Sequence, residues 1–271
     1  MDTATDYYRN KVAVVTGAAA GIGLALVEAM LDRGAAAAVL LDRDAAMLER
    51  QAERLAVSYP GRILAVVCDV SVGTEVVDAI TAAHAFGKRI DLLFNNAGLG
   101  LSGRFDELDD EDWTRAFAVN FFGPLHAIRA VLPIMRDQRG GHIVDVVSGI
   151  ALTPMAQQSM YAASKAALNA LTLALRYELW DENIRLTSAT PGTTATGIWE
   201  KNGGRPPANA QSPAQAAAAI LAGVARNERF VPGDAGDARG ARVAFDPAMA
   251  AELDAYLLDV ARRRRRGETA V

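Results

Sequence analysis

The sequence of 271 residues is poor in cysteine, histidine and net charge, and each shortage excludes a class of protein. Its one cysteine, Cys68, which we expect in the core, excludes an intrachain disulfide and favours a reducing compartment. The three histidines, His84, His126 and His142, lack the close spacing of a metal site, so we expect no metal. A net charge of -4 provides no broad basic surface for a nucleic acid. A small molecule is therefore the expected substrate.

Long apolar runs are also missing, and none reaches the roughly 18 residues that a membrane span requires. The first residues, Met1 to Asp6, do not have the pattern of a signal peptide. We therefore expect a cytoplasmic protein with no membrane span. Hydrophobic residues nevertheless make up 51% of the chain, which is enough to build the core of one α/β domain.

Short apolar runs alternate with amphipathic helical patterns along most of the chain. We expect strands over residues 11–16, 36–41, 62–67, 90–94, 142–147 and 184–189. We expect helices over residues 22–33, 44–57, 72–86, 109–137 and 158–181, with a kink or an early break at Pro133. This alternation predicts an α/β fold, a single Rossmann-like, doubly wound parallel sheet with helices on both faces.

The last third of the chain has a different composition. Residues 191–213 are rich in proline and glycine and predict an irregular loop, of which about 193–212 would form a substrate lid. A C-terminal helix and a basic tail are expected at about 247–271. The arginine run Arg262 to Arg266 predicts a solvated, irregular tail whose removal leaves activity intact.

The segment Thr16 to Gly23, TGAAAGIG, places three glycines where the first strand turns into a helix. Exposed amide groups at a helix N-terminus can bind a phosphate, although such a turn alone is a weak signal. Asp42 ends the second predicted strand, 19 residues after Gly23 (42 minus 23), where an acidic residue can bind the adenosine ribose of a dinucleotide. Asp44 is the better candidate for capping the next helix.

Several further motifs occur in a consistent order. The glycines follow the spacing G-x-x-x-G-x-G, the segment Asn95-Asn96-Ala97-Gly98 follows the fourth predicted strand, and Tyr161 and Lys165 lie four apart with Ser148 upstream. In these features the sequence resembles the short-chain dehydrogenase/reductase family over about residues 9–232.

The resemblance implies a catalytic tetrad of Asn120, Ser148, Tyr161 and Lys165 and a nicotinamide dinucleotide cofactor. It also implies that the cofactor contacts Thr16, Gly17, Gly21, Ile22, Gly23, Asp42, Arg43, Asp69, Val70, Asn96, Ala97, Gly98, Tyr161, Lys165, Pro191, Gly192, Thr194 and Thr196.

The spacing of Tyr161 and Lys165 puts both side chains on one face of a helix. An ammonium group beside a phenol lowers its pKa, so we expect Lys165 to activate Tyr161 for proton exchange with the substrate oxygen. Ser148 would donate a hydrogen bond to the same oxygen, and by resemblance Asn120 would hold a water that links Lys165 to solvent. A lone Y-x-x-x-K is more often an ordinary helix pair, but Ser148 and the glycine turn favour catalysis. Asp145 and Val147 stand where many relatives carry asparagine and serine.

The expected activity is hydride transfer between NAD and a secondary alcohol or ketone. Residues 150–160, Ile198 and Trp199 suggest a hydrophobic substrate. Asp42 favours NAD because a carboxylate repels the 2′-phosphate of NADP, whereas Arg43 could grip that phosphate. An NADPH-dependent ketoreductase is therefore the first alternative.

The dinucleotide-binding pattern is also compatible with a catalytically silent dinucleotide-binding protein and with a sugar-nucleotide epimerase or dehydratase. The intact tetrad argues against the first, and the glycine spacing argues against the second. We also expect a homo-oligomer, a tetramer or dimer, because the predicted helices spanning Trp113 to Arg136 and Met160 to Trp180 resemble those that pair between subunits of the family.

Overall fold

The computed structural model describes residues 6–100, 102–201 and 205–268. Its seven-stranded sheet has the order β3-β2-β1-β4-β5-β6-β7, and all paired strands are parallel. The strands are β1 Val12–Thr16, β2 Ala37–Asp42, β3 Ile63–Val67, β4 Leu92–Asn95, β5 Gly141–Val146, β6 Ile184–Ala189 and β7 Phe230–Val231. The helices are α2 Gly21–Asp32, α3 Ala45–Ser58, α4 Gly73–Gly87, α5 Asp110–Phe117, α6 Gly123–Asp137, α7 Ser159–Glu178, α8 Ile198–Lys201, α9 Pro213–Ala225, α10 Ala235–Val243 and α11 Ala250–Arg265.

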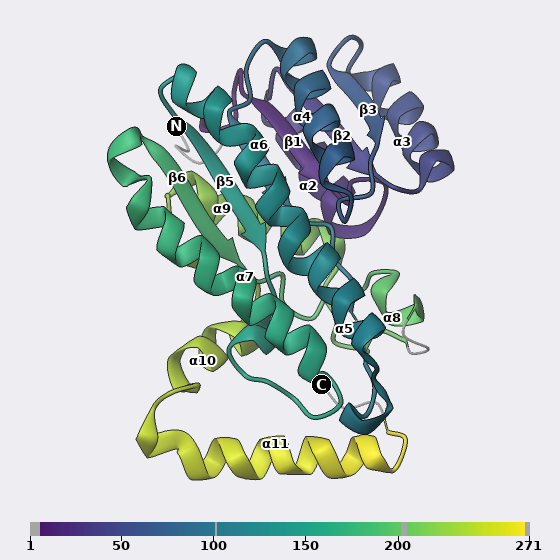
Figure 1. Cartoon of the computed structure of the whole chain (residues 1–271), viewed down its shortest axis with the longest axis vertical. Helices are drawn as coiled ribbons and strands as arrows, with labels where there is room; N and C mark the ends of the chain where they lie inside the picture. The colour runs from purple at the N-terminus through teal and green to yellow at the C-terminus, as the bar shows by residue number, and fades with distance from the viewer. Residues whose placement is uncertain (1–5, 101, 202–204, 269–271) are drawn as a thin grey trace.

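Two layers of helices enclose the sheet (Figure 1). Helices α2, α3 and α9 cover one face, where Leu26 and Ile220 are fully buried. Helices α4, α6 and α7 cover the other face, where Ile80 and Val131 are buried. The inner strands read as continuous apolar runs because both of their faces are covered. The predicted doubly wound α/β fold is therefore confirmed.

The second half of the chain contains elements that the sequence did not predict. Strand β7 has only two residues, too few to form a recognisable apolar run. Helix α9 is so rich in alanine that its sequence shows no clear helical periodicity of polar and apolar residues. Ser212 and Gln215 nevertheless form a capping box at its start. Helix α8 interrupts the loop predicted over residues 191–213, and residues 202–204 of that loop lie outside the described residues.

Of the kink or early break expected at Pro133, the early break is wrong, because α6 continues through Pro133 to Asp137. Val131 and Met135 on either side are fully buried, so packing against the sheet compensates for the hydrogen bond that proline cannot donate. The irregularity lies earlier, in a π-helical turn, Ala118–Phe122, that joins α5 to α6. Such turns insert one extra residue into a helix and often occur at functional sites.

Among the described residues, the joined segment Asp110–Asp137 is long and apolar enough to cross a membrane by length and composition alone, with a mean hydropathy of 1.3 over an 18-residue window. The sequence alone did not suggest this, because no single apolar run is that long. The apolar side chains of α6 pack against α4 and the sheet, which accounts for the hydropathy.

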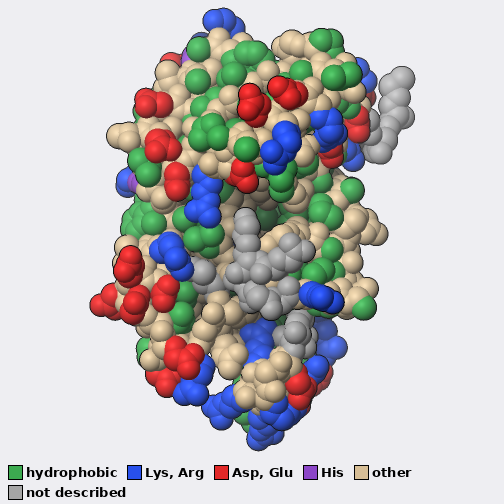
Figure 2. Space-filling model, turned by 90° about the vertical axis from the view of Figure 1, so that its right-hand side faces the viewer, with side chains coloured by type: hydrophobic (Ala, Val, Ile, Leu, Met, Phe, Trp, Pro, Cys, Tyr) green, Lys and Arg blue, Asp and Glu red, His purple; other side chains and the backbone are tan. Residues whose placement is uncertain are grey.

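The predicted irregular tail is also wrong. Helix α11 includes Arg262 to Arg265, where it ends, and Arg266 is its C-terminal cap. The arginine side chains gather at the lower end of the molecule, where α11 lies (Figure 2). A helix dipole favours positive charge near its C-terminus, which explains why a run of like charges can remain helical here.

His142 on β5 makes folding sensitive to acid. Its Nδ1 lies 2.9 Å from the Tyr7 hydroxyl, and its Nε2 lies 2.8 Å from Thr187 Oγ1. Burial, together with nearby Arg176, Lys11 and Arg185, lowers the pKa of His142 to about 3 from 6.5. The unfolded chain therefore binds a proton that the folded chain does not, and stability falls as the pH falls from 6.5 towards 3.

We expect the free energy of unfolding to decrease by about 2 kcal/mol between pH 7 and pH 5 because of this one group. Urea denaturation at the two pH values measures the decrease. His142→Gln, which keeps a donor and an acceptor but does not titrate, should lose most of this dependence. An equal pH dependence in wild type and variant would contradict the assignment.

Candidate active site

The glycine turn after β1 has a backbone that other residues could not adopt without strain. Gly17 has a φ of +66°, in the left-handed region that favours glycine. A Cβ at Gly23 would lie 2.2 Å from the Gly17 carbonyl oxygen, so no side chain fits there. The turn therefore presents bare backbone at the N-terminus of α2, as phosphate binding requires.

The segment after β4 is fastened to this turn by hydrogen bonds. Thr16 Oγ1 accepts from the backbone N–H groups of Asn96 and Ala97, each at 3.0 Å. Asn96 Nδ2 in turn donates to the carbonyl oxygens of Thr16, at 3.0 Å, and Gly17, at 3.2 Å. Thr16 is itself buried. Its hydroxyl therefore joins the glycine turn to the segment after β4 in the interior of the protein.

Asp42 is held beside the glycine turn at the end of β2. Its carboxylate accepts from the N–H of Ala19 and from the N–H of Asp44, both at 3.0 Å. The predicted cap is confirmed, because Asp44 Oδ1 accepts from Met47 N at the start of α3. Asp42 is thus free of a capping role, and the neighbouring Arg43 is exposed.

Asp69 and Val70 follow β3 and frame the same edge of the sheet. The Ser71 hydroxyl lowers the pKa of Asp69, and the nearby Arg43 charge contributes, while burial opposes the shift. Val70 is buried, and a Cβ at Gly123 of α6 would lie 3.0 Å from its side chain. Val70 therefore packs α6 against the sheet.

A pocket of about 1200 Å³ opens at the carboxyl ends of the strands. Of the residues predicted to form the site, it is lined by Ile22, Asn96, Gly98, Ser148, Tyr161, Lys165, Pro191, Gly192, Thr194 and Thr196. The others lie beneath or beside it: Thr16, Gly17, Gly21, Gly23, Asp42, Arg43, Asp69, Val70, Ala97 and Asn120. One cavity thus extends from the start of α2 to the side chains of α7.

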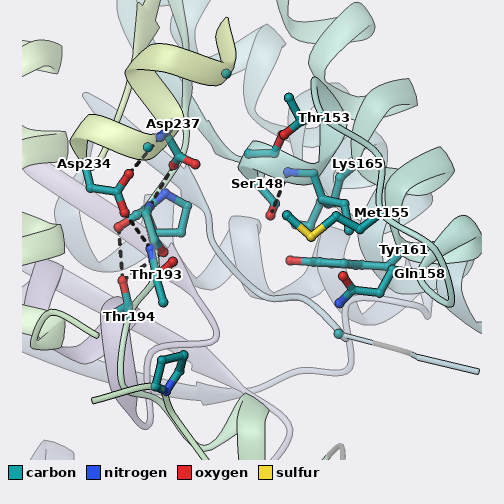
Figure 3. A pocket seen from close by; sticks show the side chains of 18 of the residues that line it. Ser148, Thr153, Met155, Gln158, Tyr161, Lys165, Thr193, Thr194, Asp234 and Asp237 are labelled. Atoms are coloured by element: carbon teal, nitrogen blue, oxygen red, sulfur yellow. Dashed lines mark hydrogen bonds between the residues drawn. The ribbon is translucent and has the colours of Figure 1, made fainter. Parts of the chain in front are cut away.

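Figure 3 shows Ser148 and Tyr161 on one wall of this pocket, with their hydroxyl groups directed into it. Ser148 lies just beyond the end of β5, and Tyr161 is in the first turn of α7. Lys165, one turn further along α7, is 3% exposed and donates from Nζ to the Val146 carbonyl oxygen at 2.9 Å. The three side chains that the sequence placed together therefore share one site.

The expected lowering of the tyrosine pKa is not found. Burial raises the pKa of Tyr161 and the charge of Asp237 raises it further, while an interaction with the Ser148 hydroxyl opposes the shift. Burial also lowers the pKa of Lys165 to about 8, and the charge of Asp145 opposes that shift. Desolvation outweighs the attraction between ammonium and phenolate that the sequence spacing suggested.

Asn120 lies in the π-helical turn and is fully buried. Its Oδ1 accepts from Leu99 N at 2.8 Å, and its Nδ2 donates to Leu99 O at 2.9 Å and to Ser164 Oγ at 3.0 Å. The side chain thus connects the segment after β4 to α7. The expected role of Asn120 in holding a water between Lys165 and solvent stays a prediction.

Two aspartates that the sequence analysis missed hold the segment after β6. Asp237 Oδ2 accepts from Gly192 N, and Asp234 Oδ2 accepts from Thr193 N, each at 2.9 Å. Asp234 also caps α10, and both aspartates lie across the pocket from Ser148 and Tyr161 (Figure 3). The sequence signal was an aspartate directly before a helical segment, but that segment was not predicted.

The segment after β6 continues over the glycine turn. A Cβ at Gly21 would lie 3.4 Å from the Thr196 methyl group, so the two segments touch. Thr194 Oγ1 lies 3.0 Å from the Pro191 carbonyl oxygen, and Trp199 Nε1 donates to the Thr194 carbonyl oxygen at 2.8 Å. The proposed lid is thereby joined to the loop that carries Gly192.

The last helices complete the pocket. Val243 of α10 and Leu253 and Tyr256 of α11 contribute to its lining. Arg264 donates to the Ala156 carbonyl oxygen at 2.6 Å and to Gln158 Oε1 at 2.9 Å. Helix α11 therefore holds the segment that precedes Tyr161, which makes the basic end of the chain part of the site rather than a tail.

Comparisons with known proteins agree with this architecture. The family model for short chain dehydrogenase matches residues 11–205. An uncharacterized oxidoreductase of Staphylococcus saprophyticus is 36% identical over 188 residues, which are 69% of this chain and 80% of the relative.

Two solved structures are similar over most of their length. A short chain dehydrogenase/reductase from Burkholderia phymatum in complex with NAD has a TM-score of 0.76 and 26% identity, covering 98% of both chains. An NADPH-bound short chain oxidoreductase from Pseudomonas aeruginosa has a TM-score of 0.74 and 30% identity, covering 83% of this chain and 96% of that one. The chain therefore belongs to the short-chain dehydrogenase/reductase family of oxidoreductases.

Proposed function

We propose that the protein is an NAD-dependent oxidoreductase that interconverts a secondary alcohol and a ketone with apolar substituents. The observation that carries the proposal is the single pocket that joins the glycine turn to Ser148, Tyr161 and Lys165. The apolar residues Val243, Leu253 and Tyr256 on the opposite wall support a hydrophobic substrate. A silent dinucleotide-binding protein would have no need for the two hydroxyls and the buried amine.

The residues of the pocket fit a dinucleotide. The turn at Gly17 to Gly23 would hold the pyrophosphate, and Asp42 would accept hydrogen bonds from the adenosine ribose. Lys165 and the Pro191 to Thr196 segment are the candidates for holding the nicotinamide half. When bound, the nicotinamide ring supplies or accepts the hydride.

Tyr161 is the proposed proton donor to the substrate oxygen. Its raised pKa keeps the phenol neutral near pH 7, the form that can protonate the oxygen of a ketone. Ser148 would donate a hydrogen bond to the same oxygen, and Lys165 as an ammonium would stabilise the phenolate that remains. The site is thus better prepared for ketone reduction than for alcohol oxidation at neutral pH.

The preference for NAD rests on the position of Asp42. Two backbone N–H groups hold its carboxylate at the strand end, where it would repel a 2′-phosphate. Arg43 is exposed and can turn towards solvent. The NAD-bound relative from Burkholderia phymatum and the NADPH-bound relative from Pseudomonas aeruginosa show that this family includes both cofactors, so NADPH remains the alternative.

Replacing Tyr161 with phenylalanine should reduce turnover of a ketone with NADH by about 10²- to 10⁴-fold, because only the proton donor is removed. NADH binding, measured by fluorescence, should remain. The matched control is Tyr177→Phe on the same helix, where the ring is 62% exposed and lies outside the pocket lining. Near-normal turnover of the Tyr161 variant would refute the acid role.

Steady-state kinetics with both cofactors should give a higher kcat/KM for NADH than for NADPH. Replacing Asp42 with alanine should reduce the ratio of kcat/KM for NADH to kcat/KM for NADPH by about tenfold or more, because the carboxylate no longer repels the 2′-phosphate. Asp44→Ala is the control, because it removes an adjacent carboxylate that caps α3. A wild-type preference for NADPH would overturn the assignment.

We also propose a cytoplasmic homo-oligomer, a tetramer or dimer, assembled through the long helices. Exposed aromatic side chains on or next to these helices support it: Phe122, just before α6, is 45% exposed, Tyr177 on α7 62%, and Trp180, just after α7, 40%. Light scattering at micromolar concentration should detect the oligomer. A monomer throughout that range would contradict it.

A further inference from the structure

Asp145 is a buried carboxylate in the floor of the site that has no role in the proposed reaction. It lies on β5 between Asn95 of β4 and Ser188 of β6 and is fully buried. Asn95 Nδ2 lies 2.7 Å from its Oδ1, and Thr172 Oγ1 of α7 lies 2.7 Å from its Oδ2. A carboxylate in such a position normally has a positive partner, because burying an isolated charge is costly.

The available partner is Lys165. Its Nζ donates to the carbonyl oxygen of Val146, the residue directly after Asp145 on the strand. The charge of Asp145 opposes the lowering of the Lys165 pKa by burial. Burial raises the pKa of Asp145, while the hydrogen bonds from Asn95 and Thr172 and the charge of Lys165 oppose that rise. Both side chains are buried. Among the described residues no hydrogen bond or ion pair joins them directly, so they interact electrostatically over a longer distance.

We propose that Asp145 is a positioning residue that keeps Lys165 in its ammonium form beneath Tyr161. The inference rests on the proposed function, in which Lys165 must be charged to stabilise the phenolate. Burial alone favours the neutral amine, and the buried negative charge of Asp145 favours the ammonium. Asn120 also lies near the lysine, since a Cβ at Gly98 would lie 3.2 Å from Lys165 Nζ and 3.3 Å from Asn120 Oδ1. The charge of Asp237, from α10, acts on Tyr161.

The competing state is a protonated, neutral Asp145. Thr172 Oγ1 lies 2.7 Å from both Asp145 Oδ2 and the Leu168 carbonyl oxygen, and its one proton can serve only one of them. A protonated Asp145 could donate to Thr172, which would donate to Leu168. In that state Asp145→Asn would leave the Lys165 pKa unchanged, whereas the proposed ionised state requires the Lys165 pKa to fall.

Asparagine can replace Asp145 with little rearrangement. It has the same shape, and Asn95 Oδ1 is a buried atom without a hydrogen-bond partner among the described residues. Rotation of the Asn95 amide would present this oxygen to the new Nδ2 group. The variant Asp145→Asn therefore removes the charge while it preserves packing and hydrogen bonding.

The protonation state of Lys165 can be measured without a substrate. The sequence has only four lysines, Lys11, Lys88, Lys165 and Lys201, so selective ¹³Cε-lysine labelling of the full chain gives four signals. The signal missing in Lys165→Arg identifies Lys165. Titration should give a pKa of about 8 in wild type and a value at least about one unit lower in Asp145→Asn.

Ser188→Ala is the matched control, because it removes a buried hydroxyl beside Asp145 that binds Asn169 instead. Its Lys165 titration should match wild type. If Asp145→Asn does not fold, Asp145→Ser provides the same charge removal in a smaller side chain. An unchanged Lys165 pKa in the Asp145 variant, or an equal shift in Ser188→Ala, would overturn the proposal.

The pH profile of ketone reduction with NADH provides a second measurement. Its alkaline decline should move to lower pH in Asp145→Asn and stay in place in Ser188→Ala. The titration of Lys165 is independent of turnover, whereas the Tyr161→Phe comparison tests the reaction itself. A failure of the proposal for Asp145 can therefore be distinguished from a failure of the proposed oxidoreductase function.

Discussion

The parallel arrangement of all the paired strands is the constraint on which the site depends. Parallel strands place their carboxyl ends on one edge of the sheet, so the segments after β1, β2, β4, β5 and β6 converge there although they are far apart in sequence. Short hydrogen bonds then join neighbouring segments, such as those from Thr16 to the loop after β4. Ser148, Tyr161 and Lys165 are positioned by this edge and by the start of α7, which packs beside β5 and β6.

Most of this edge could be predicted from the sequence, because short stretches of neighbouring residues indicate the strands and the turns that follow them. Apolar runs gave six of the seven strands, and the glycine spacing gave the turn before α2. The features that the sequence did not predict depend on contacts between residues that are far apart in the chain. Strand β7 exists because β6 offers it hydrogen-bonding partners, and α6 continues past Pro133 because its buried face holds it. Asp234 and Asp237 could not be recognised before α10 was known to face Gly192.

The electrostatics of the site were the least predictable feature. Four-residue spacing indicates that Tyr161 and Lys165 share a helix face, but not how much water reaches them. Burial governs both groups, raising the pKa of the phenol and lowering that of the amine. The charge that acts on Tyr161 is that of Asp237, on α10, which lies far from Tyr161 in the sequence. The charge that acts on Lys165 is that of Asp145, on β5 of the sheet. Charge balance is therefore a property of the assembled fold.

The contact of Arg264 with residues 156 and 158 has a consequence for synthesis of the protein. The glycine turn leaves the ribosome long before α11 does. The sheet can form while the chain is still growing, since its strands end at Val231, but the wall behind the pocket cannot. A polypeptide that stopped after β7 would hold the cofactor turn and both hydroxyls in an open groove. The pocket is thus enclosed only after α11 has been synthesised.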